Sequence, residues 1–317
     1  MSATNEAVRE DVRVVVSVDD TDDLTKVTST GAVADALMAL TESLGGVAEL
    51  GVSRHQLPRL PGIAYTSHNS SMTFTATMPS VPAYERLLAE APGVVVEGSV
   101  AGSDPGLCVY ALPEAGGEAE LHLLLEYGTR AKHHVMSKAD AYGVAAQIAG
   151  MTLVELGGNG EGIIGALAGV ALRLSGSDGR FRGTVSLFDG EECTTDVSSI
   201  VAALGGPTLA QVCDVSGMVL DGGERVVTRP NMKAVWLHHK VTLLVTISNG
   251  GWHVLDKVGV RDLERPDPAE SRSCDQFEAD NDPEEMDGEP NEPICANCLY
   301  SRRLEHGAFC MKHMRPS

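Results

Sequence analysis

The feature that most constrains the fold of this chain is an apolar run at residues 12–18, which is rich in valine and bounded by charged residues. Such a run predicts a buried strand of a mixed or parallel sheet. It leads directly into the sequence Asp19-Asp20-Thr21-Asp22-Asp23. Because α/β sheets bind ligands beyond the carboxyl ends of their strands, the densest acidic motif of the chain is predicted to lie at a ligand-binding edge.

Strand and helix patterns follow one another along most of the chain, which predicts an α/β fold with mixed sheets. Ser29 or Thr30 is a suitable N-cap for a helix over residues 31–44, which Gly45-Gly46 would end. Further helices are predicted over residues 81–91, 118–126, 131–148 and 163–174. Strands are predicted over residues 47–52, 73–77, 94–96, 107–111, 151–156, 183–187, 234–237 and 241–247, with a proline-containing loop over 57–69.

The composition excludes several classes of protein. Hydrophobic residues make up 43% of the 317 residues, which is enough for a sizeable core and argues against disorder throughout. No run of about 18 apolar residues is present, and residues 1–10 are polar and acidic. We therefore expect no membrane-spanning helix, no signal peptide and no membrane partner. The expected location is the cytoplasm, where cysteines stay reduced.

The formal net charge of −20 disfavours broad contact with a phosphate backbone. The charge is uneven, however, because residues 262–292 contain thirteen acidic residues and two arginines, and so carry −11 of the −20. This segment is rich in proline as well, which predicts an acidic linker. The remaining chain is only moderately acidic and leaves room for a local basic site.

Carboxylates fill four of the five positions 19–23. Carboxylates this close repel one another unless a cation lies among them. Oxygen ligands of this kind suit Mg²⁺, which commonly bridges protein carboxylates to phosphates. We therefore predict a metal and phosphate site at Asp19, Asp20 and Asp22, with hydroxyl groups nearby at Thr21, Thr25, Thr28, Ser29 and Thr30. The alternative is a solvated acidic turn.

A second motif, GGNGEGIIG at residues 157–165, follows a predicted strand and opens a predicted helix. Backbone amides of such a loop, together with the N-terminus of the helix, can hold a phosphate. The predicted nucleotide contacts are Gly158, Asn159, Gly160 and Gly162. The alternative is a tight turn that packs the helix closely on the strand. The loop lacks the Lys-Ser or Lys-Thr pair of a Walker A motif, so it is not a P-loop.

Taken together, these motifs resemble a known family. The segments VSVDDTD (residues 16–22), LPGIAY (60–65), APGVVV (91–96) and GNGEGIIGALA (158–168) are similar to archaeal tRNA-isoleucine agmatinylcytidine synthetase, also called agmatidine synthetase. They match its ATP-dependent kinase-like domain and the neighbouring ferredoxin-like domain. The resemblance covers roughly residues 12–190 and implies an α/β kinase-like domain with a ferredoxin-like neighbour.

The resemblance also implies an activity and its partners. In that family the DDTD aspartates bind Mg²⁺ and the ATP phosphates, a threonine just downstream is autophosphorylated, and a tRNA cytidine is activated for attack by agmatine. By position, Ser29 aligns with that threonine and Thr30 with the next residue. ATP, Mg²⁺, and tRNA or another small acceptor are the implied partners. Arg54, His55 and Arg59 lie close together in sequence and are candidates for neutralising phosphate.

The chain departs from the family at two places. Lys26-Val27-Thr28 replaces the usual Gly-Met-Cys, and Thr66 and His68 stand where the family carries Lys and Arg. The residues after 190 are also too few for the family's oligonucleotide-binding barrel and zinc ribbon. Two functions are therefore weighed. The first is an ATP-dependent ligase or kinase-like enzyme with an open acceptor, and the second is a non-catalytic nucleotide- or RNA-binding module with a zinc-stabilised tail.

The C-terminal segment carries a predicted metal site. Cys295 and Cys298 form a Cys-x-x-Cys half-site, because two thiolates at this spacing can chelate one ion. Cys310 and His313 would complete a Cys₃His zinc knuckle, whereas Cys274 with Cys310 would give four thiolates for Zn²⁺ or an iron–sulfur cluster. The predicted domains are residues 11–190 (ATP-binding region), 191–260 (mixed α/β extension), 261–292 (acidic linker) and 293–317 (Cys-rich metal knuckle).

Overall fold

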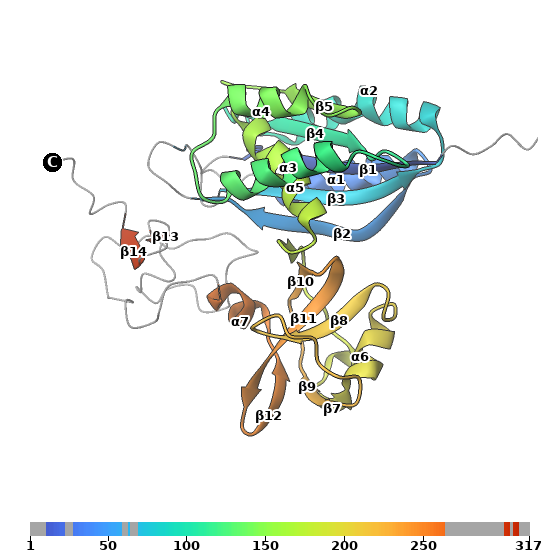
Figure 1. The fold of residues 1–317 in the computed structure, drawn as a ribbon, viewed down its shortest axis with the longest axis vertical. Coiled ribbons are helices and arrows are strands. Elements are labelled where there is room, and N and C mark those ends of the chain that lie inside the picture. Colours follow the sequence, from blue (N-terminus) through green and yellow to red (C-terminus); the bar gives the residue numbers. More distant parts are fainter. Residues whose placement is uncertain are drawn as a thin grey trace, which may run out of the picture. The chain divides into compact units, whose positions relative to one another are not determined.

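The structure is a computed structural model that describes residues 11–22, 28–58, 63 and 69–263, together with the backbone of 301–304 and 307–310. The chain divides into two compact units between Gly179 and Arg180. Both units contain paired strands and helices, and Figure 1 shows the elements of both.

The first unit is built on a five-stranded sheet with the order β5-β4-β1-β3-β2, in which all neighbouring strands are antiparallel. The acidic motif therefore does follow a central strand, and this strand is antiparallel to both of its neighbours. Helices cover both faces of the sheet, so a central antiparallel strand is as continuously apolar as a parallel one. The strands are β1 (Val12–Asp19), β2 (Val47–Gln56), β3 (Ser70–Met78), β4 (Gly106–Ala111) and β5 (Met151–Glu155).

Alternate residues of β1 enter two separate cores. Val14, Val16 and Val18 pack with α1 (Thr30–Ser43) and α2 (Val81–Gly98). On the other face, Val15 packs with α3 (Glu118–Ala131), α4 (Lys138–Ala145) and α5 (Gly162–Ser175). The two layers of helices hold β1 between them, and so fix the direction in which its acidic end points (Figure 1).

The predicted strand at residues 94–96 is wrong, because these residues belong to α2, which continues past Pro92. Val95 is fully buried against the first core, and this packing outweighs the strand preference of three consecutive valines. The helix predicted over 131–148 is shorter in the structure: α3 continues to Ala131, and α4 starts only at Lys138, with a capping box formed by Ser137 and Asp140. The segment between them lines the site described below.

The second unit has the strand order β6-β10-β11-β12-β9-β7, with β8 paired to β11. Its β8–β11 and β9–β12 pairs are parallel and the others are antiparallel, so the prediction of mixed sheets is confirmed here. Residues 183–187 form no strand, contrary to prediction, and only Val185 makes an isolated bridge. The elements are β6 (Arg180–Phe181), η1 (Phe188–Gly190), β7 (Cys193–Asp196), α6 (Val197–Ala203), β8 (Ala210–Asp214), β9 (Arg225–Thr228), β10 (Ala234–Leu237), β11 (Lys240–Ser248), β12 (Gly251–Val254) and α7 (Lys257–Asp262).

Near the C-terminus, β13 (Ser301–Leu304) and β14 (Gly307–Cys310) form a separate two-stranded sheet. Cys274, Cys295, Cys298 and His313 lie outside the described residues, and only the backbone of Cys310 is described. The predicted metal knuckle therefore stays a prediction.

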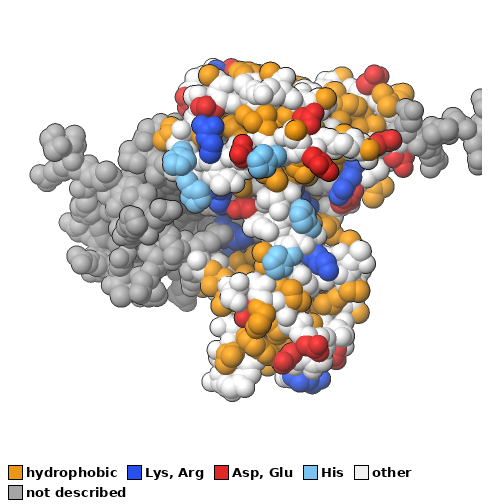
Figure 2. Space-filling view, viewed as in Figure 1, with side chains coloured by type: hydrophobic (Ala, Val, Ile, Leu, Met, Phe, Trp, Pro, Cys, Tyr) orange, Lys and Arg blue, Asp and Glu red, His pale blue; other side chains and the backbone are white. Residues whose placement is uncertain are grey.

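On the face in Figure 2, acidic and basic side chains are interspersed among apolar ones. Most of the acidic stretch at 262–292 lies outside the described part. None of the described helices is long and apolar enough to cross a membrane.

Candidate functional site

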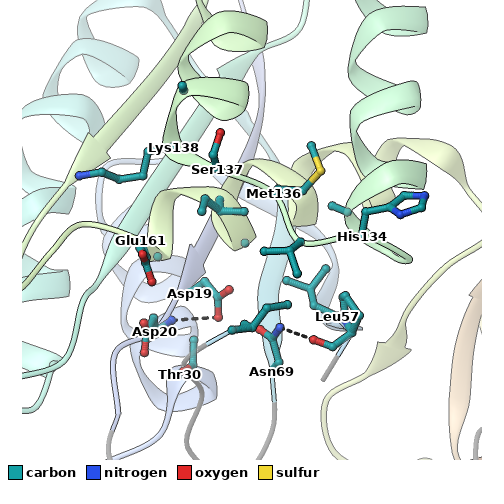
Figure 3. A pocket seen from close by; sticks show the side chains of 18 of the residues that line it. Asp19, Asp20, Thr30, Leu57, Asn69, His134, Met136, Ser137, Lys138 and Glu161 are labelled. Atoms are coloured by element: carbon teal, nitrogen blue, oxygen red, sulfur yellow. Dashed lines mark hydrogen bonds between the residues drawn. The ribbon is translucent and has the colours of Figure 1, made fainter. Parts of the chain in front are cut away.

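A cavity of about 480 Å³ opens in the first unit, where the acidic end of β1 meets the first residues of α1 and α5. This volume is typical of a small-molecule site. Figure 3 shows Asp19, Asp20, Thr30 and Glu161 at one end, and Met136, His134 and Leu57 at the other. The lining residues are Asp19, Asp20, Asp22, Thr30, Leu57, Pro58, Ile63, Asn69, Ala131, His134, Val135, Met136, Ser137, Lys138, Ala139, Glu161, Gly162, Ile164 and Gly165.

A turn at Asp19 and Asp20 aims the carboxylates into this space. Asp20 has the left-handed backbone angle φ 56°, which Asp tolerates better than most residues. Its backbone N–H donates to Asp19 Oδ1 at 2.9 Å. Asp19 Oδ2 lies against α5 at Gly165, where any Cβ would overlap it. A glycine is therefore required at 165 for the carboxylate to lie there.

The electrostatic setting of these carboxylates is unfavourable without a cation. Burial raises the pKa of Asp19 well above its usual range, and the charges of Asp20 and Asp22 raise it further. Burial also raises the pKa of Asp20 to about 7, with additional repulsion from Asp104, Asp22 and Glu161. The positive charge of Arg54 lowers the pKa of Asp19, but it is the smallest of these contributions. Among the described residues, the end of β1 thus concentrates carboxylates, each of which raises the pKa of its neighbours.

Asp104 was missed by the sequence reasoning. It precedes β4, whose register places Gly106 opposite Asp19, so the two acidic positions meet through strand pairing. Only the pairing of β1 with β4 reveals this contact, and no local motif indicates it. Glu161 comes from the glycine-rich loop and lines the cavity as well.

The predicted phosphate-binding role of the glycine-rich loop stays a prediction. Its amides already have protein acceptors: Asn159 N–H donates to Asp104 Oδ1 at 2.6 Å, and Gly162 N–H to Asp104 O at 3.0 Å. Gly160 and Glu161 donate to acceptors inside the loop. Of the four predicted contacts, Gly162 lines the cavity, whereas Gly158, Asn159 and Gly160 do not. The glycines here allow close packing: a Cβ at Gly162 would overlap Asp104 O.

The hydroxyl groups near the acidic turn separate into distinct roles. Ser29 is the N-cap of α1, and its Oγ accepts from Ala32 N–H at 3.2 Å. Thr30 lines the cavity. Thr21 is fully buried and does not line it, and its backbone carbonyl accepts from Val100 N–H at 2.9 Å. Of these three residues, Thr30 is therefore the one that contributes to the cavity wall, and Thr25 lies outside the described residues.

The opposite wall of the cavity comes from the segment between α3 and α4, which the sequence patterns assigned to one continuous helix. His134 lines the cavity with Val135 and Met136. Lys138 Nζ donates to Glu155 Oε1 and Oε2 at 3.0 and 2.9 Å and to Asn159 O at 2.6 Å. Lys138 thereby ties this wall to the glycine-rich loop.

Two of the three residues that were candidates for neutralising phosphate lie in a strand and away from the cavity. Arg54 and His55 lie within β2, are 5% and 0% exposed, and do not line the cavity. They were predicted to face phosphate because β2 was expected to end at residue 52, but the strand continues to Gln56. Arg59 lies outside the described residues.

In the part of the chain that the structure describes, no three His, Cys, Asp or Glu side chains are grouped as a ready metal site. Among the cysteines there, Cys108 and Cys213 are buried, and Cys193 is half-buried.

The fold and the cavity define a class: an α/β protein with a small-molecule site whose one end is lined by carboxylates. No sequence-family model matches the chain, and no curated protein matches it. Solved structures do match, over half of this chain. One is a tRNA fluorescent labeling enzyme, at 24% identity and a TM-score of 0.42, with 36% of that protein covered.

Other matches are structures of TiaS, an agmatidine synthetase that acts on an isoleucine tRNA. Its complex with that tRNA and ATP matches at 23% identity and a TM-score of 0.43, over 50% of this chain and 36% of that one. Apo TiaS matches at 22% identity and a TM-score of 0.41, over 50% of this chain and 35% of that one. These proteins carry the name of the family that the motifs resemble. The chain spans about a third of their length.

Proposed function

We propose that this chain is an Mg²⁺-dependent, ATP-utilising enzyme that activates an acceptor by phosphoryl transfer. The observation that carries the proposal is the state of Asp19, whose carboxylate is buried, faces the cavity and has a raised pKa beside Asp20 and Asp22. A divalent cation stabilises the charged form of a carboxylate in this setting more than it stabilises a carboxylate that already has a cationic partner. The DDTD and GNGEGIIGALA motifs support the same two ligands by resemblance.

The residues fit Mg²⁺ in the way that nucleotide-bound Mg²⁺ is usually held. Such sites use one or two protein carboxylates, and phosphates and water supply the remaining ligands. Asp19 and Asp20 are the candidates for direct ligands, with Asp22 at the same edge. When bound there, the ion would offset phosphate charge as the phosphoryl group is transferred.

The chain's own residues would then position the reactants. The apolar end of the cavity, at Leu57, Val135 and Met136, is suited to a nucleobase, and the acidic end to the metal-bound phosphates. Thr30 presents a hydroxyl at the acidic end. Thr30 is therefore our first candidate for the phosphorylated residue, and Ser29, which aligns with the family's threonine, is the second.

The test is a calorimetric titration with ATP in the presence and absence of Mg²⁺, followed by analysis of the nucleotide products with and without tRNA. We expect Mg²⁺-dependent binding and turnover that an acceptor stimulates. tRNA, which is present in one of the similar structures, is the first acceptor to try. Binding without any turnover would favour the non-catalytic nucleotide- or RNA-binding module, and no binding in either condition would refute the proposal.

The phosphorylated hydroxyl is found by incubation with ATP labelled at the γ-phosphate and peptide mapping. We expect the label on Thr30, and its loss in Thr30→Val and in Asp20→Asn. Label that persists in Thr30→Val and disappears in Ser29→Ala would transfer the role to Ser29. Complete absence of label under conditions where ATP binds would remove the covalent step from the proposal.

We propose further that the C-terminal cysteines bind Zn²⁺ or an iron–sulfur cluster, on the strength of the Cys295-x-x-Cys298 spacing. Protein purified without oxygen should contain about one equivalent of metal, which the double variant Cys295→Ser, Cys298→Ser should lose. Elemental analysis that finds no metal in the wild-type protein would contradict this.

A further inference from the structure

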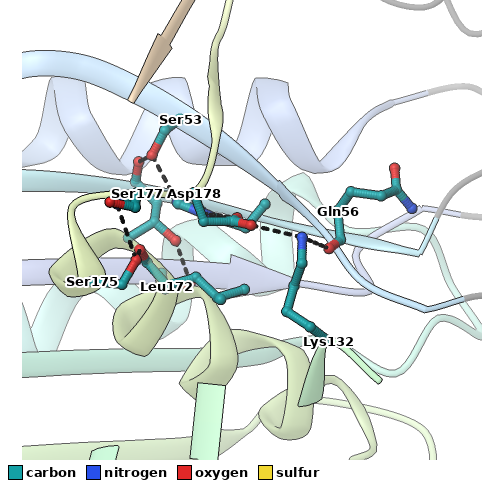
Figure 4. Close-up of polar contacts among 10 residues, drawn as sticks. Ser53, Gln56, Lys132, Leu172, Ser175, Ser177 and Asp178 are labelled. Carbon is teal, nitrogen blue, oxygen red and sulfur yellow. Dashed lines mark hydrogen bonds and ion pairs between the residues drawn. The ribbon is translucent and has the colours of Figure 1, made fainter. Parts of the chain in front are cut away.

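A second buried polar cluster lies in the first unit, apart from the acidic end of β1. Lys132 Nζ lies 2.7 Å from Asp178 Oδ2, and His55 Nδ1 lies 2.9 Å from Asp178 Oδ1. Ser53 Oγ is 2.8 Å from His55 Nε2. Figure 4 shows Lys132 directed toward Asp178 and toward the backbone of Gln56. The four side chains form one continuous series of polar contacts.

The cluster joins three segments that are far apart in the sequence. Ser53 and His55 belong to the end of β2, Lys132 is the C-cap of α3, and Asp178 lies in the turn after α5. Gly179 belongs to the same arrangement: with φ 120°, it leaves room for His55, whose ring lies 2.8 Å from the position a Cβ would take. The turn is braced from within, since Ser175 Oγ accepts from Ser177 N–H at 3.2 Å and donates to Leu172 O at 2.6 Å.

The cluster is not a hydrolytic triad, although it has the Ser–His–Asp order. Ser53 and His55 are fully buried and neither lines the cavity, so no substrate reaches them. Ser53 Oγ also lies 3.2 Å from Thr73 O, to which it can donate. The cluster must therefore either stabilise the fold or act on the cavity through neighbouring residues.

Those neighbours are cavity walls. Lys132 Nζ also donates to Gln56 O at 2.8 Å, and the next two residues along the chain, Leu57 and Pro58, line the cavity. On the other side of Lys132, Ala131 and the segment 134–139 line the facing wall. Lys132 is thus the direct bond between two walls of one cavity, and Asp178 holds its ammonium group in place.

We propose that Lys132 and Asp178 are positioning residues that hold the segment 131–139 against the end of β2, in the geometry that binds the nucleotide. The proposal rests on the proposed function only for the identity of the ligand. Neither residue touches the ligand. They act by restricting the wall that carries His134, Val135 and Met136, because a binding wall that is displaced by about 1 Å loses much of its effect.

The test combines hydrogen exchange with nucleotide binding, in Lys132→Met, Asp178→Asn and the double variant. The milder Lys132→Gln, which keeps a donor for Gln56 O but no charge, serves if Lys132→Met does not fold. Leu87→Ala is the matched control, since Leu87 is fully buried in α2 in the other core and its truncation destabilises the unit without touching either wall.

We expect the amides of residues 133–139 to exchange faster in the cluster variants and not in Leu87→Ala. The dissociation constant for Mg²⁺·ATP should rise roughly tenfold in each single variant, with no further rise in the double variant. If exchange at 133–139 is unchanged, or if it increases while ATP affinity stays at the wild-type value, the positioning role is refuted. If wild-type protein binds no ATP, the proposed function fails, and the exchange result alone still decides whether Lys132 and Asp178 hold the wall.

Discussion

Two aspartates of the first unit, Asp19 and Asp178, show how differently the surroundings of a carboxylate set its pKa within one fold. Asp19 has a pKa raised well above its usual range, because burial and the charges of Asp20 and Asp22 act in the same direction. Burial acts on Asp178 in the same way, but the hydrogen bond from His55 and the charge of Lys132 outweigh it and lower its pKa to about 2. Their side chains differ in their partners far more than in their burial.

The comparison separates binding from stability. Asp178 is already paired inside the protein, so its charge stabilises the fold and has little left to offer a ligand. Asp19 is held in place by Gly165 and the Asp20 amide, and its raised pKa shows that its negative charge is unfavourable in the fold. Under the proposed function, a bound cation would relieve this unfavourable charge. Unfavourable charge is tolerated at binding sites because the ligand relieves it.

The largest expected effect is on nucleotide binding. Asp19→Asn keeps an oxygen for the Asp20 amide but removes the negative charge, so we expect the dissociation constant for Mg²⁺·ATP to rise about 100-fold. The control is Glu90→Gln, which removes an exposed carboxylate paired with Arg86 on α2. Calorimetry with equal affinities for Asp19→Asn and Glu90→Gln would remove the distinction between the two aspartates.

The free energy of unfolding should change more in Asp178→Asn than in Asp19→Asn, and with the opposite sign. Asp178→Asn leaves the ammonium group of Lys132, which is 28% exposed, without its carboxylate, and should lower the free energy of unfolding by about 2 kcal/mol. Asp19→Asn relieves repulsion and should raise it by up to about 1 kcal/mol in metal-free protein. Chemical denaturation in EDTA measures both. A loss of stability in Asp19→Asn as large as that in Asp178→Asn would show that both carboxylates are structural.

The free energy of unfolding should depend on pH in opposite directions through Asp178 and through Asp20. The folded-state pKa of Asp178 is about 2, below its usual value of 3.8, so its contribution of about 2 kcal/mol is present above pH 4 and is lost as the pH falls from about 4 to 2. The folded-state pKa of Asp20 is about 7, so its stabilising effect is present below about pH 4 and is lost as the pH rises through 7.

The measurement is denaturation of metal-free wild type, Asp20→Asn and Asp178→Asn between pH 2 and 8. The stability gained by Asp20→Asn over the wild type should grow from pH 4 to pH 8. The deficit of Asp178→Asn should shrink below pH 4. His55, whose pKa is lowered by burial against the opposing effect of Asp178, should add a decline in wild-type stability as the pH falls below about 6.5. If the free energy of unfolding varied with pH in the same way in all three proteins, the pKa shifts assigned to Asp20 and Asp178 would be contradicted.

The smallest expected effect concerns the hydroxyl beside the acidic turn. Ser29→Ala removes the side-chain cap of α1 and should lower the free energy of unfolding by about 1 kcal/mol. Thr30→Val keeps the cap and its shape, and should change stability less while removing the hydroxyl from the cavity. Denaturation of the two variants checks this, and a larger loss in Thr30→Val would mean that Thr30 supports the fold rather than the site.

Local patterns in the sequence were sufficient for the elements that carry the motif. The apolar run before Asp19, the Ser29 cap, the Gly45 turn and the helix after Gly162 are each specified by residues within a few positions of one another. Such signals act through backbone geometry and neighbouring side chains, and so they can be read without the fold. The acidic motif at the end of β1, and the resemblance to a nucleotide-using family that it supports, can likewise be recognised from neighbouring residues without the fold.

Only the tertiary structure decided the rest, because the decisive contacts join residues far apart in the chain. Burial of Val95 turned a predicted strand into helix, and antiparallel pairing brought Asp104 to the acidic turn. The break between α3 and α4 made residues 134–137 part of a cavity wall rather than part of a helix. Asp178 obtained its low pKa from Lys132 and His55, at separations of 46 and 123 residues. Charge compensation and packing depend on distances in space, so the sequence could place the carboxylates but could not show which of them were already paired.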